Sequence, residues 1–249
     1  MMLSKTPMIR LLLFTILSSV YMTPARADVM LLIHGYLADA NSWEQSGINE
    51  TLHNNGWPRA GMFRGSHLGP RLFTIEQQQD DNDNSVYVAA LPFEMPVMVQ
   101  SDTLKHTLDI IKQLHPDEKI VLVGHSAGGV VARMTLIRHQ LEDIIALITI
   151  ASPHLGTGRA DQALKITRNH GPFNMVKRFV GGNTYDALRH SRGLMVDLRH
   201  PQPGNLLFWL NSQPHPDIHY SSIIRTDHRG MIGDEIVPGF SQDMNNIPA

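Results

Sequence analysis

The chain has 249 residues, with 21 lysines and arginines, 23 aspartates and glutamates, and no cysteine. Its formal net charge is −2, and the chain after residue 27 carries −5 (18 − 23), which argues against nucleic acid as a partner because phosphate binding requires a basic surface. Without cysteine the sequence allows no disulfide, no thiolate metal site and no lipidation on cysteine.

Residues 1–27 have the pattern of an export signal. Lys5 and Arg10 precede a mostly apolar run at 11–22, and residues 25–27 (Ala-Arg-Ala) form a small-x-small cleavage site. The run is shorter than the roughly 20 residues that span a bilayer, so an uncleaved membrane anchor is the less favoured alternative. Cleavage would leave 249 − 27 = 222 residues, enough for one domain, with a net charge of 18 − 23 = −5. We therefore expect a periplasmic or secreted protein.

The first segments after the leader predict a strand, a turn and a helix. Residues 29–33 are uninterruptedly apolar, which is typical of a strand buried on both faces of a parallel sheet. A helix is expected from Asn41 or Ser42 to Gly56. Residues 57–85 are rich in glycine, proline and then polar residues, and predict an irregular surface excursion. Its acidic residues (Asp80, Asp81 and Asp83) lack the spacing of a calcium loop, so a solvated loop is favoured over a cation site.

The middle of the chain alternates strands with helices. Strands are expected at 86–91, 120–123 and 144–150, with a helix at 96–115 and another directly after Ser126. Strands that alternate with helices predict right-handed crossovers and a mostly parallel sheet with helices on both faces.

The alternation stops between residues 157 and 216. Helical segments are expected at 160–168, 174–180 and 205–211, and together they predict a small helical cap over the strand ends, before a last strand at 220–225. The cap holds several large apolar residues that either line an acyl pocket or pack the cap onto the sheet: Phe173, Met175, Phe179, Leu194, Met195, Phe208 and Trp209.

The stretch GHSAGG at 124–129 carries the chemistry. A sharp turn between a strand and a helix would expose Ser126 Oγ at the top of the sheet, and glycines on both sides of the turn remove clashing Cβ atoms. The N-terminus of the following helix would direct N–H groups and a positive dipole end at the same place. Ser126 is therefore a candidate nucleophile.

Four motifs in register resemble those of the α/β-hydrolase superfamily, and within it those of exported bacterial lipases and esterases. They are IHGY at 33–36, GHSAGG at 124–129, ASPHLG at 151–156 and GDEIVP at 233–238, so the resemblance spans 28–249. It implies an α/β-hydrolase fold in which Ser126 is the nucleophile and Asp234 the acid, with Glu235 less favoured. The oxyanion would be held by the N–H groups of Tyr36 and Ala127.

Three other histidines near these motifs are not expected to be the base. The resemblance implies a structural role for His34, and the same role is expected for His154. His125, beside Ser126, is expected to point into the fold.

The base histidine has no clear candidate. Such enzymes place it after the acid, but no histidine follows Asp234, and the final strand and histidine loop of the fold are absent from the sequence. We expect an incomplete chain; the alternatives are His228 as an unusual base, or an inactive protein.

These features predict an exported serine hydrolase that cleaves carboxylic esters through an acyl-serine intermediate, without a metal or another cofactor. Its expected partners are a small acyl ester or a lipid, and transiently a lipid surface. The same elbow serves acyltransferases, thioesterases and amidases, and a noncatalytic ligand-binding protein would also keep the pocket.

Overall fold

The computed structural model describes residues 28–67, 69–74, 84–168, 186–225 and 236–248. Several predicted features lie outside these ranges: the leader at 1–27, the acidic residues at 80–83, the helix at 174–180, and the site candidates His228, Asp234 and Glu235. The expectations about them remain predictions.

A seven-stranded sheet forms the centre of the molecule, in the order β3-β2-β4-β1-β5-β6-β7. Its strands are β1 (Asp28–Ile33), β2 (Arg59–Ser66), β3 (Gly69–Thr74), β4 (Ser85–Ala89), β5 (Lys119–His125), β6 (Ile144–Ile150) and β7 (His219–Ile223). All neighbouring strands are parallel except β2 and β3. The predicted mostly parallel sheet is therefore confirmed.

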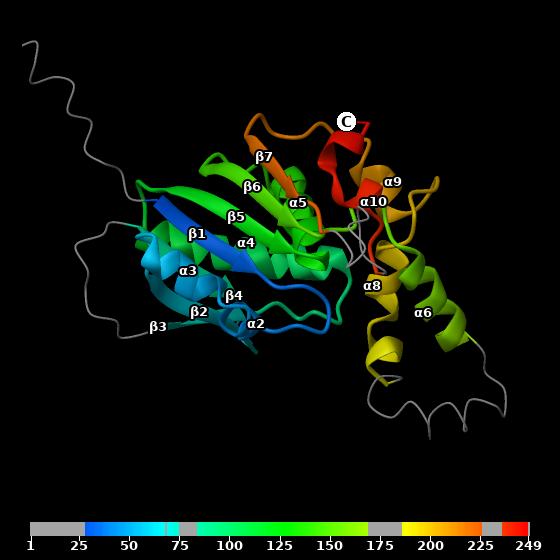
Figure 1. Cartoon of the computed structure of the whole chain (residues 1–249), viewed down its shortest axis with the longest axis horizontal. Coiled ribbons are helices and arrows are strands. Elements are labelled where there is room, and N and C mark those ends of the chain that lie inside the picture. Colours follow the sequence, from blue (N-terminus) through cyan, green and yellow to red (C-terminus); the bar gives the residue numbers. More distant parts are fainter. Residues whose placement is uncertain (1–27, 68, 75–83, 169–185, 226–235, 249) are drawn as a thin grey trace, which may run out of the picture.

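Helices cover both faces of the sheet (Figure 1). One face carries α2 (Ser42–Gln45) and α3 (Ile48–Asn54), and the other carries α4 (Val97–Leu114) and α5 (Ala127–His139). The buried apolar residues form two clusters that match these two layers, one of which includes Trp43 and the other Leu104. None of the helices that the structure describes is long and apolar enough to cross a membrane.

The single helix predicted from residue 41 or 42 to residue 56 is divided in two. Gly47 separates α2 from α3 with a φ of 74°, a left-handed conformation that glycine adopts without steric cost. The predicted start is correct, since Asn41 is the residue before α2.

The prediction of an irregular excursion at 57–85 is wrong for its first part. Strands β2 and β3 form an antiparallel hairpin there, at the edge of the sheet. The glycines and prolines of this segment had suggested a loop. The hairpin nevertheless requires one of those glycines, because a Cβ on Gly61 would lie 2.8 Å from Leu72 Cδ1 and 2.9 Å from Phe73 O. A glycine inside a strand can thus mark a close approach of the partner strand rather than a loop.

A group of short helices stands at the end of the sheet toward which β1 and β5 run (Figure 1). It comprises α6 (Gly158–Arg168), α8 (Arg192–Asp197) and α9 (Leu206–Leu210), and the chain continues after β7 with α10 (Gly239–Gln242) and the 3-10 helix η1 (Met244–Asn246). Helix α8 was not predicted. Leu194 and Met195 are buried in the core, so they pack the cap onto the sheet, whereas Phe208 and Trp209 are exposed.

Helix α8 is anchored to the N-terminus of α4. Asp197 Oδ2 accepts a hydrogen bond of 2.8 Å from the N–H of Val97, which is one of the α4 donors that lack a partner within the helix. The helices also approach closely, because a Cβ on Gly193 would lie 2.8 Å from Pro96 Cγ. Asp197, at the end of α8, therefore acts as a helix-capping residue for the N-terminus of α4.

Asp197→Asn should alter the pH dependence of folding. Burial raises the pKa of Asp197, while its hydrogen bond from Val97 lowers it. Because the folded carboxyl holds its proton more tightly than the unfolded one, the wild type should gain stability relative to the variant as the pH falls from about 7 to about 4. Asparagine keeps an oxygen acceptor, so little loss is expected at neutral pH. Urea unfolding of both proteins measures the difference, and a pH-independent difference would contradict the prediction.

Candidate active site

Ser126 occupies the turn between β5 and α5. Its φ of 52° and ψ of −126° are rare for a residue with a Cβ, and they cost about 1–3 kcal/mol. The turn is held because the Ser126 N–H donates to Ile150 O at 2.8 Å and the Gly129 N–H donates to Ser126 O at 3.1 Å. Strain of this kind is common where a side chain must be presented to a ligand.

Strained backbone recurs along the same edge of the sheet. Of the four described non-glycine residues with positive φ, Leu37, Ser126 and Ala151 each follow the carboxyl end of a strand (β1, β5 and β6). These three strands are adjacent in the sheet. Ligands of open α/β sheets bind at this edge, so the strain lies where a site is expected.

The glycines of the elbow are required by close packing. A Cβ on Gly128 would lie 2.5 Å from His34 O, and one on Gly124 would lie 2.5 Å from Gly129 Cα. A Cβ on Gly35 would lie 2.8 Å from Ser126 Cβ. The turn after β1 and the turn after β5 are therefore in direct contact.

Gly128→Ala should damage the site and the fold together. The new methyl group would overlap backbone atoms of residues 33 and 34, which cannot move away as a flexible side chain could. We expect a loss of about 1–3 kcal/mol in the free energy of unfolding. Gly158→Ala is a suitable control, because no atom of the described residues lies within 4 Å of its added Cβ. Thermal unfolding of the two variants tests the prediction, and equal stability would contradict it.

The predicted oxyanion donors lie on either side of Ser126. Ala127 begins α5, and Tyr36 follows Gly35 in the turn that contacts Ser126. Neither N–H is hydrogen-bonded to any residue that the structure describes. They are available to a ligand, but their role as an oxyanion hole remains a prediction.

His34 has the structural role expected of it. The buried ring accepts a hydrogen bond of 3.0 Å from the Leu91 N–H at Nε2 and contacts Gly35 O at 2.9 Å through Nδ1. Because Nε2 is an acceptor, the proton of the neutral ring is on Nδ1 and is donated to Gly35 O. Burial lowers the pKa of His34, which favours this neutral form, although the Gly35 bond acts in the opposite direction. Both ring nitrogens are engaged, so His34 is not a base.

His154 is held in the same way. Arg133 Nη1 donates to its Nδ1 at 3.2 Å, so the neutral ring carries its proton on Nε2, which lies 3.2 Å from Thr149 Oγ1. Burial, and then the charge of Arg133, hold the pKa of His154 well below its ordinary value. The ring is unsuited to accept a proton from Ser126.

Arg133 was not predicted as a site residue, yet its hydrogen bonds join α5 to the segment after β6 and to the segment after α9. It is fully buried on α5, and besides His154 it donates through Nη2 to Asn211 Oδ1, directly after the cap helix α9. Asn211 Nδ2 in turn donates to His154 O at 3.1 Å. Burial lowers the pKa of Arg133 to about 9, so the group is still charged at neutral pH. No carboxylate among the described residues forms an ion pair with it.

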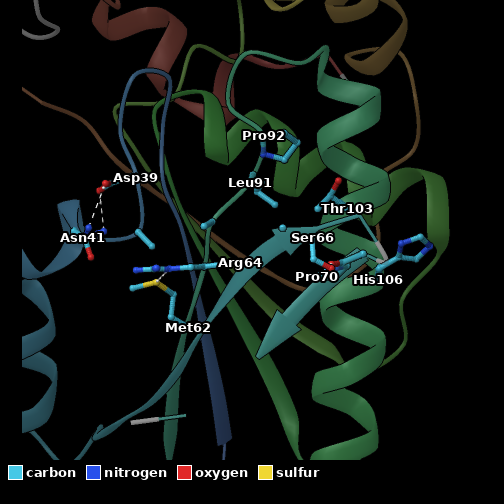
Figure 2. A pocket seen from close by; sticks show the side chains of 14 residues that line it. Asp39, Asn41, Met62, Arg64, Ser66, Pro70, Leu91, Pro92, Thr103 and His106 are labelled. Carbon is cyan, nitrogen blue, oxygen red and sulfur yellow. Dashed lines mark hydrogen bonds between the residues drawn. The ribbon is translucent and has the colours of Figure 1, made fainter. Parts of the chain in front are cut away.

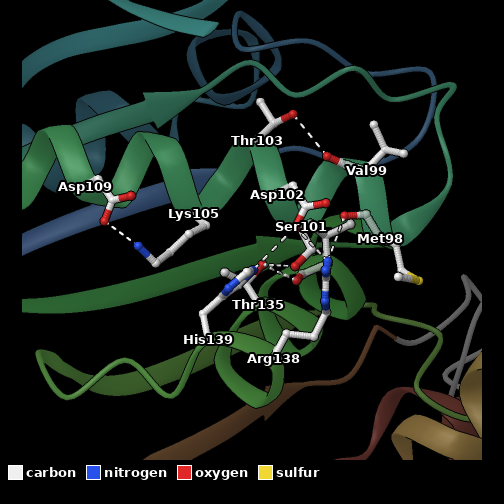
Figure 3. A network of polar contacts seen from close by, with 11 residues as sticks. Met98, Val99, Ser101, Asp102, Thr103, Lys105, Asp109, Thr135, Arg138 and His139 are labelled. Atoms are coloured by element: carbon white, nitrogen blue, oxygen red, sulfur yellow. Dashed lines mark hydrogen bonds and ion pairs between the residues drawn. The ribbon is translucent and has the colours of Figure 1, made fainter.

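A second polar network attaches the other side of α5 to α4 (Figure 3). Thr135 Oγ1 donates to Ser101 Oγ at 3.1 Å in the buried interface. Arg138 Nη1 donates to Asp102 Oδ1 at 2.7 Å near the surface. The second half of α5, the helix that directly follows Ser126, is therefore attached to α4.

The acid and the base are not placed by these observations. Asp234, Glu235 and His228 lie outside the described ranges, and Ser126 Oγ makes no hydrogen bond with any described residue. The ring of His125 packs edge-on against the ring of the buried Trp43, with 6.4 Å between the two ring centroids. Of the predicted site residues, the structure brings together Ser126, Tyr36 and Ala127.

Sequence comparisons identify similarity over part of the chain. Residues 94–175 match a PGAP1-like alpha/beta domain, a stretch that contains α4, β5, the elbow, α5 and β6. A 62-residue segment is 36% identical to GPI inositol-deacylase B of Yarrowia lipolytica, which is 22% of this chain and 6% of that protein. The match therefore spans a small fraction of the length of this curated relative.

Structural comparisons cover most of the chain. The mature Bacillus licheniformis lipase BlEst2 superposes with a TM-score of 0.57 at 17% identity, covering 89% of this chain and 80% of the lipase. The lin2722 product of Listeria innocua superposes with a TM-score of 0.55 at 15% identity, covering 87% of this chain and 77% of the Listeria protein. Phospholipase PlaB of Legionella pneumophila superposes with a TM-score of 0.55 at 13% identity, covering 88% of this chain and 46% of the phospholipase. With its sheet order and its strained serine turn, the chain has the α/β-hydrolase fold.

Proposed function

We propose that the chain is an exported serine hydrolase of carboxylic esters, similar to lipases and esterases. Ser126 attacks the acyl carbonyl, a histidine accepts its proton, and Asp234 orients that histidine. The N–H groups of Tyr36 and Ala127 hold the oxyanion, and water then releases the acid from the acyl-serine. The positive φ of Ser126, at an elbow in contact with the turn after β1, is the observation that carries the proposal.

An apolar acyl group is supported by the surroundings of the site. Leu37, directly after Tyr36, and Phe240, in α10, are 56% and 55% exposed, although both are large and apolar. Both lie near carboxyl ends of strands: Leu37 is four residues after β1, and Phe240 is next to Ser241, whose backbone oxygen accepts a hydrogen bond of 2.8 Å from the His154 N–H after β6. We propose that they contact an acyl chain or, transiently, a lipid surface.

The reaction is tested with the purified protein and three substrates that share one acyl group. We expect cleavage of a p-nitrophenyl ester, with slower or no cleavage of the matched thioester and amide. Preference for the thioester or amide would indicate one of the alternative acyl-transfer activities. Binding of the ester without turnover would favour the noncatalytic alternative, in which Ser126 Oγ lacks a histidine partner, as it does among the described residues.

Export is tested separately. We propose that residues 1–27 direct the chain out of the cytoplasm and are removed after Ala27. N-terminal sequencing of the protein recovered from outside the cytoplasm should begin at Asp28. An intact N-terminus on recovered protein would contradict cleavage.

A further inference from the structure

Figure 2 shows a groove of about 660 Å³. Its lining includes residues at or after the carboxyl ends of β1, β2 and β4, the same edge of the sheet at which Ser126 follows β5. Its walls come from the ends of β2 and β4, from the chain that follows β1, and from one side of α4. One wall residue, Leu91, donates its N–H to His34, and His34 in turn holds Gly35 against Ser126. Hydrogen bonds therefore link one wall of the groove to the turn that carries the predicted oxyanion donor.

Arg64 provides a cation in this groove that forms no ion pair with a described residue. Its Nε lies 3.1 Å from Met62 Sδ, and its guanidinium lies 5.8 Å from the centre of the Phe73 ring. These contacts fix the stem of the side chain but leave the two Nη groups without a partner among the residues described. In Figure 2 the side chain lies across the groove, between Asp39–Asn41 and Ser66.

The groove also contains a carboxylate, that of Asp39, and both of its oxygens accept hydrogen bonds from Asn41. Asp39 Oδ1 accepts from the Asn41 N–H at 2.9 Å, and Oδ2 accepts from Asn41 Nδ2 at 3.3 Å. Asp39 and Arg64 form no ion pair. His106, on the α4 wall, adds a second side chain that has no bonded partner within the described part of the chain. The free hydrogen-bonding capacity of the groove thus favours an anion.

We propose that this groove binds an anionic group of the ester substrate, a phosphate or a carboxylate, with Arg64 as its principal contact. The guanidinium presents parallel N–H donors that match the oxygens of such a group. Met62, Leu91 and Pro92 supply an apolar floor for the part of the substrate that joins the anion to the ester. This inference rests on the proposed hydrolase function and specifies the substrate class that the site prefers.

The test compares two soluble esters with the same acyl chains, dihexanoyl phosphatidylglycerol and neutral dihexanoylglycerol. In the wild type we expect a higher kcat/KM for the anionic ester, and this preference should fall about tenfold in Arg64→Gln. Because the contact is exposed, the preference should also weaken at high salt. The control is Arg71→Gln, which removes the same charge from the facing position of the β2–β3 hairpin, outside the groove lining.

The outcomes separate the two proposals. An unchanged preference in Arg64→Gln, or an equal loss in Arg71→Gln, would overturn the anion site while hydrolysis itself stands. If neither ester is cleaved, the proposed function fails, and calorimetric binding of the anionic ester to Ser126→Ala, with and without Arg64→Gln, still tests the groove. A tenfold weaker binding without Arg64 supports the site. Inorganic phosphate that binds Ser126→Ala as tightly as the ester would identify a free-phosphate site and overturn the substrate assignment.

Discussion

Replacement of Ser126 by alanine should remove hydrolysis and all labelling by a fluorophosphonate probe. Loss of a nucleophile lowers the rate of serine hydrolases by roughly 10⁴- to 10⁶-fold, because the remaining oxyanion donors and binding contacts supply only residual catalysis. Ester cleavage and in-gel labelling measure the two effects. Labelling that persists in Ser126→Ala would show that another residue is the nucleophile.

The same position should also reveal the strain of the elbow. Alanine keeps the Cβ that makes a φ of 52° unfavourable, whereas glycine adopts positive φ without steric cost. We expect Ser126→Gly to be more stable than Ser126→Ala by about 1 kcal/mol, although glycine raises the entropy of the unfolded chain. Both variants lack the Ser126 hydroxyl, so the comparison isolates the effect of the Cβ on the turn. Equal stability would mean that the turn is not strained.

Much of the sheet could be predicted because its signals are local. The strand at 144–150 agrees with β6, and the helix at 96–115 differs from α4 by one residue at each end. Uninterrupted apolar runs mark strands that are buried on both faces, and the order of strands and helices then implies a parallel sheet. The β2–β3 hairpin escaped prediction because its glycines serve strand pairing, which only the partner strand reveals.

The turn at Ser126 could be predicted because its signals are local, whereas the catalytic roles of its residues remain predictions. Ser126 and Ala127 are adjacent, and the glycines that flank them indicate the turn directly. Arg133 and Asn211 are 78 residues apart, and nothing in the pattern of α5 distinguishes a buried arginine from a solvated one. Arginine is rarely fully buried, so the local pattern favours the surface. Only the packing of the cap against α5 reveals the network.

Removal of Asn211 should have the largest effect on stability. In Asn211→Ala the guanidinium of Arg133 would stay buried but lose one of its two acceptors, and its Nε already lacks a partner among the described residues. His154 O would lose a donor as well. A hydrogen bond to a buried charged group is worth about 1.5–3 kcal/mol, so we expect a loss of about 3 kcal/mol in the free energy of unfolding. Asn55→Ala, which deletes one exposed hydrogen bond of 2.8 Å to Thr51 O, should cost less than about 1 kcal/mol.

A double-mutant cycle separates this explanation from a simple loss of packing. Arg133→Met removes the buried charge, so adding Asn211→Ala to it should cost less than Asn211→Ala costs in the wild type. We expect a coupling energy of about 1–2 kcal/mol between the two residues, measured by urea unfolding. Additive losses would show that Asn211 contributes by filling space beside α9. Coupling would instead show that Asn211 stabilises the fold by hydrogen-bonding the buried guanidinium of Arg133, and so links the end of the cap helix α9 to α5, the helix that directly follows Ser126.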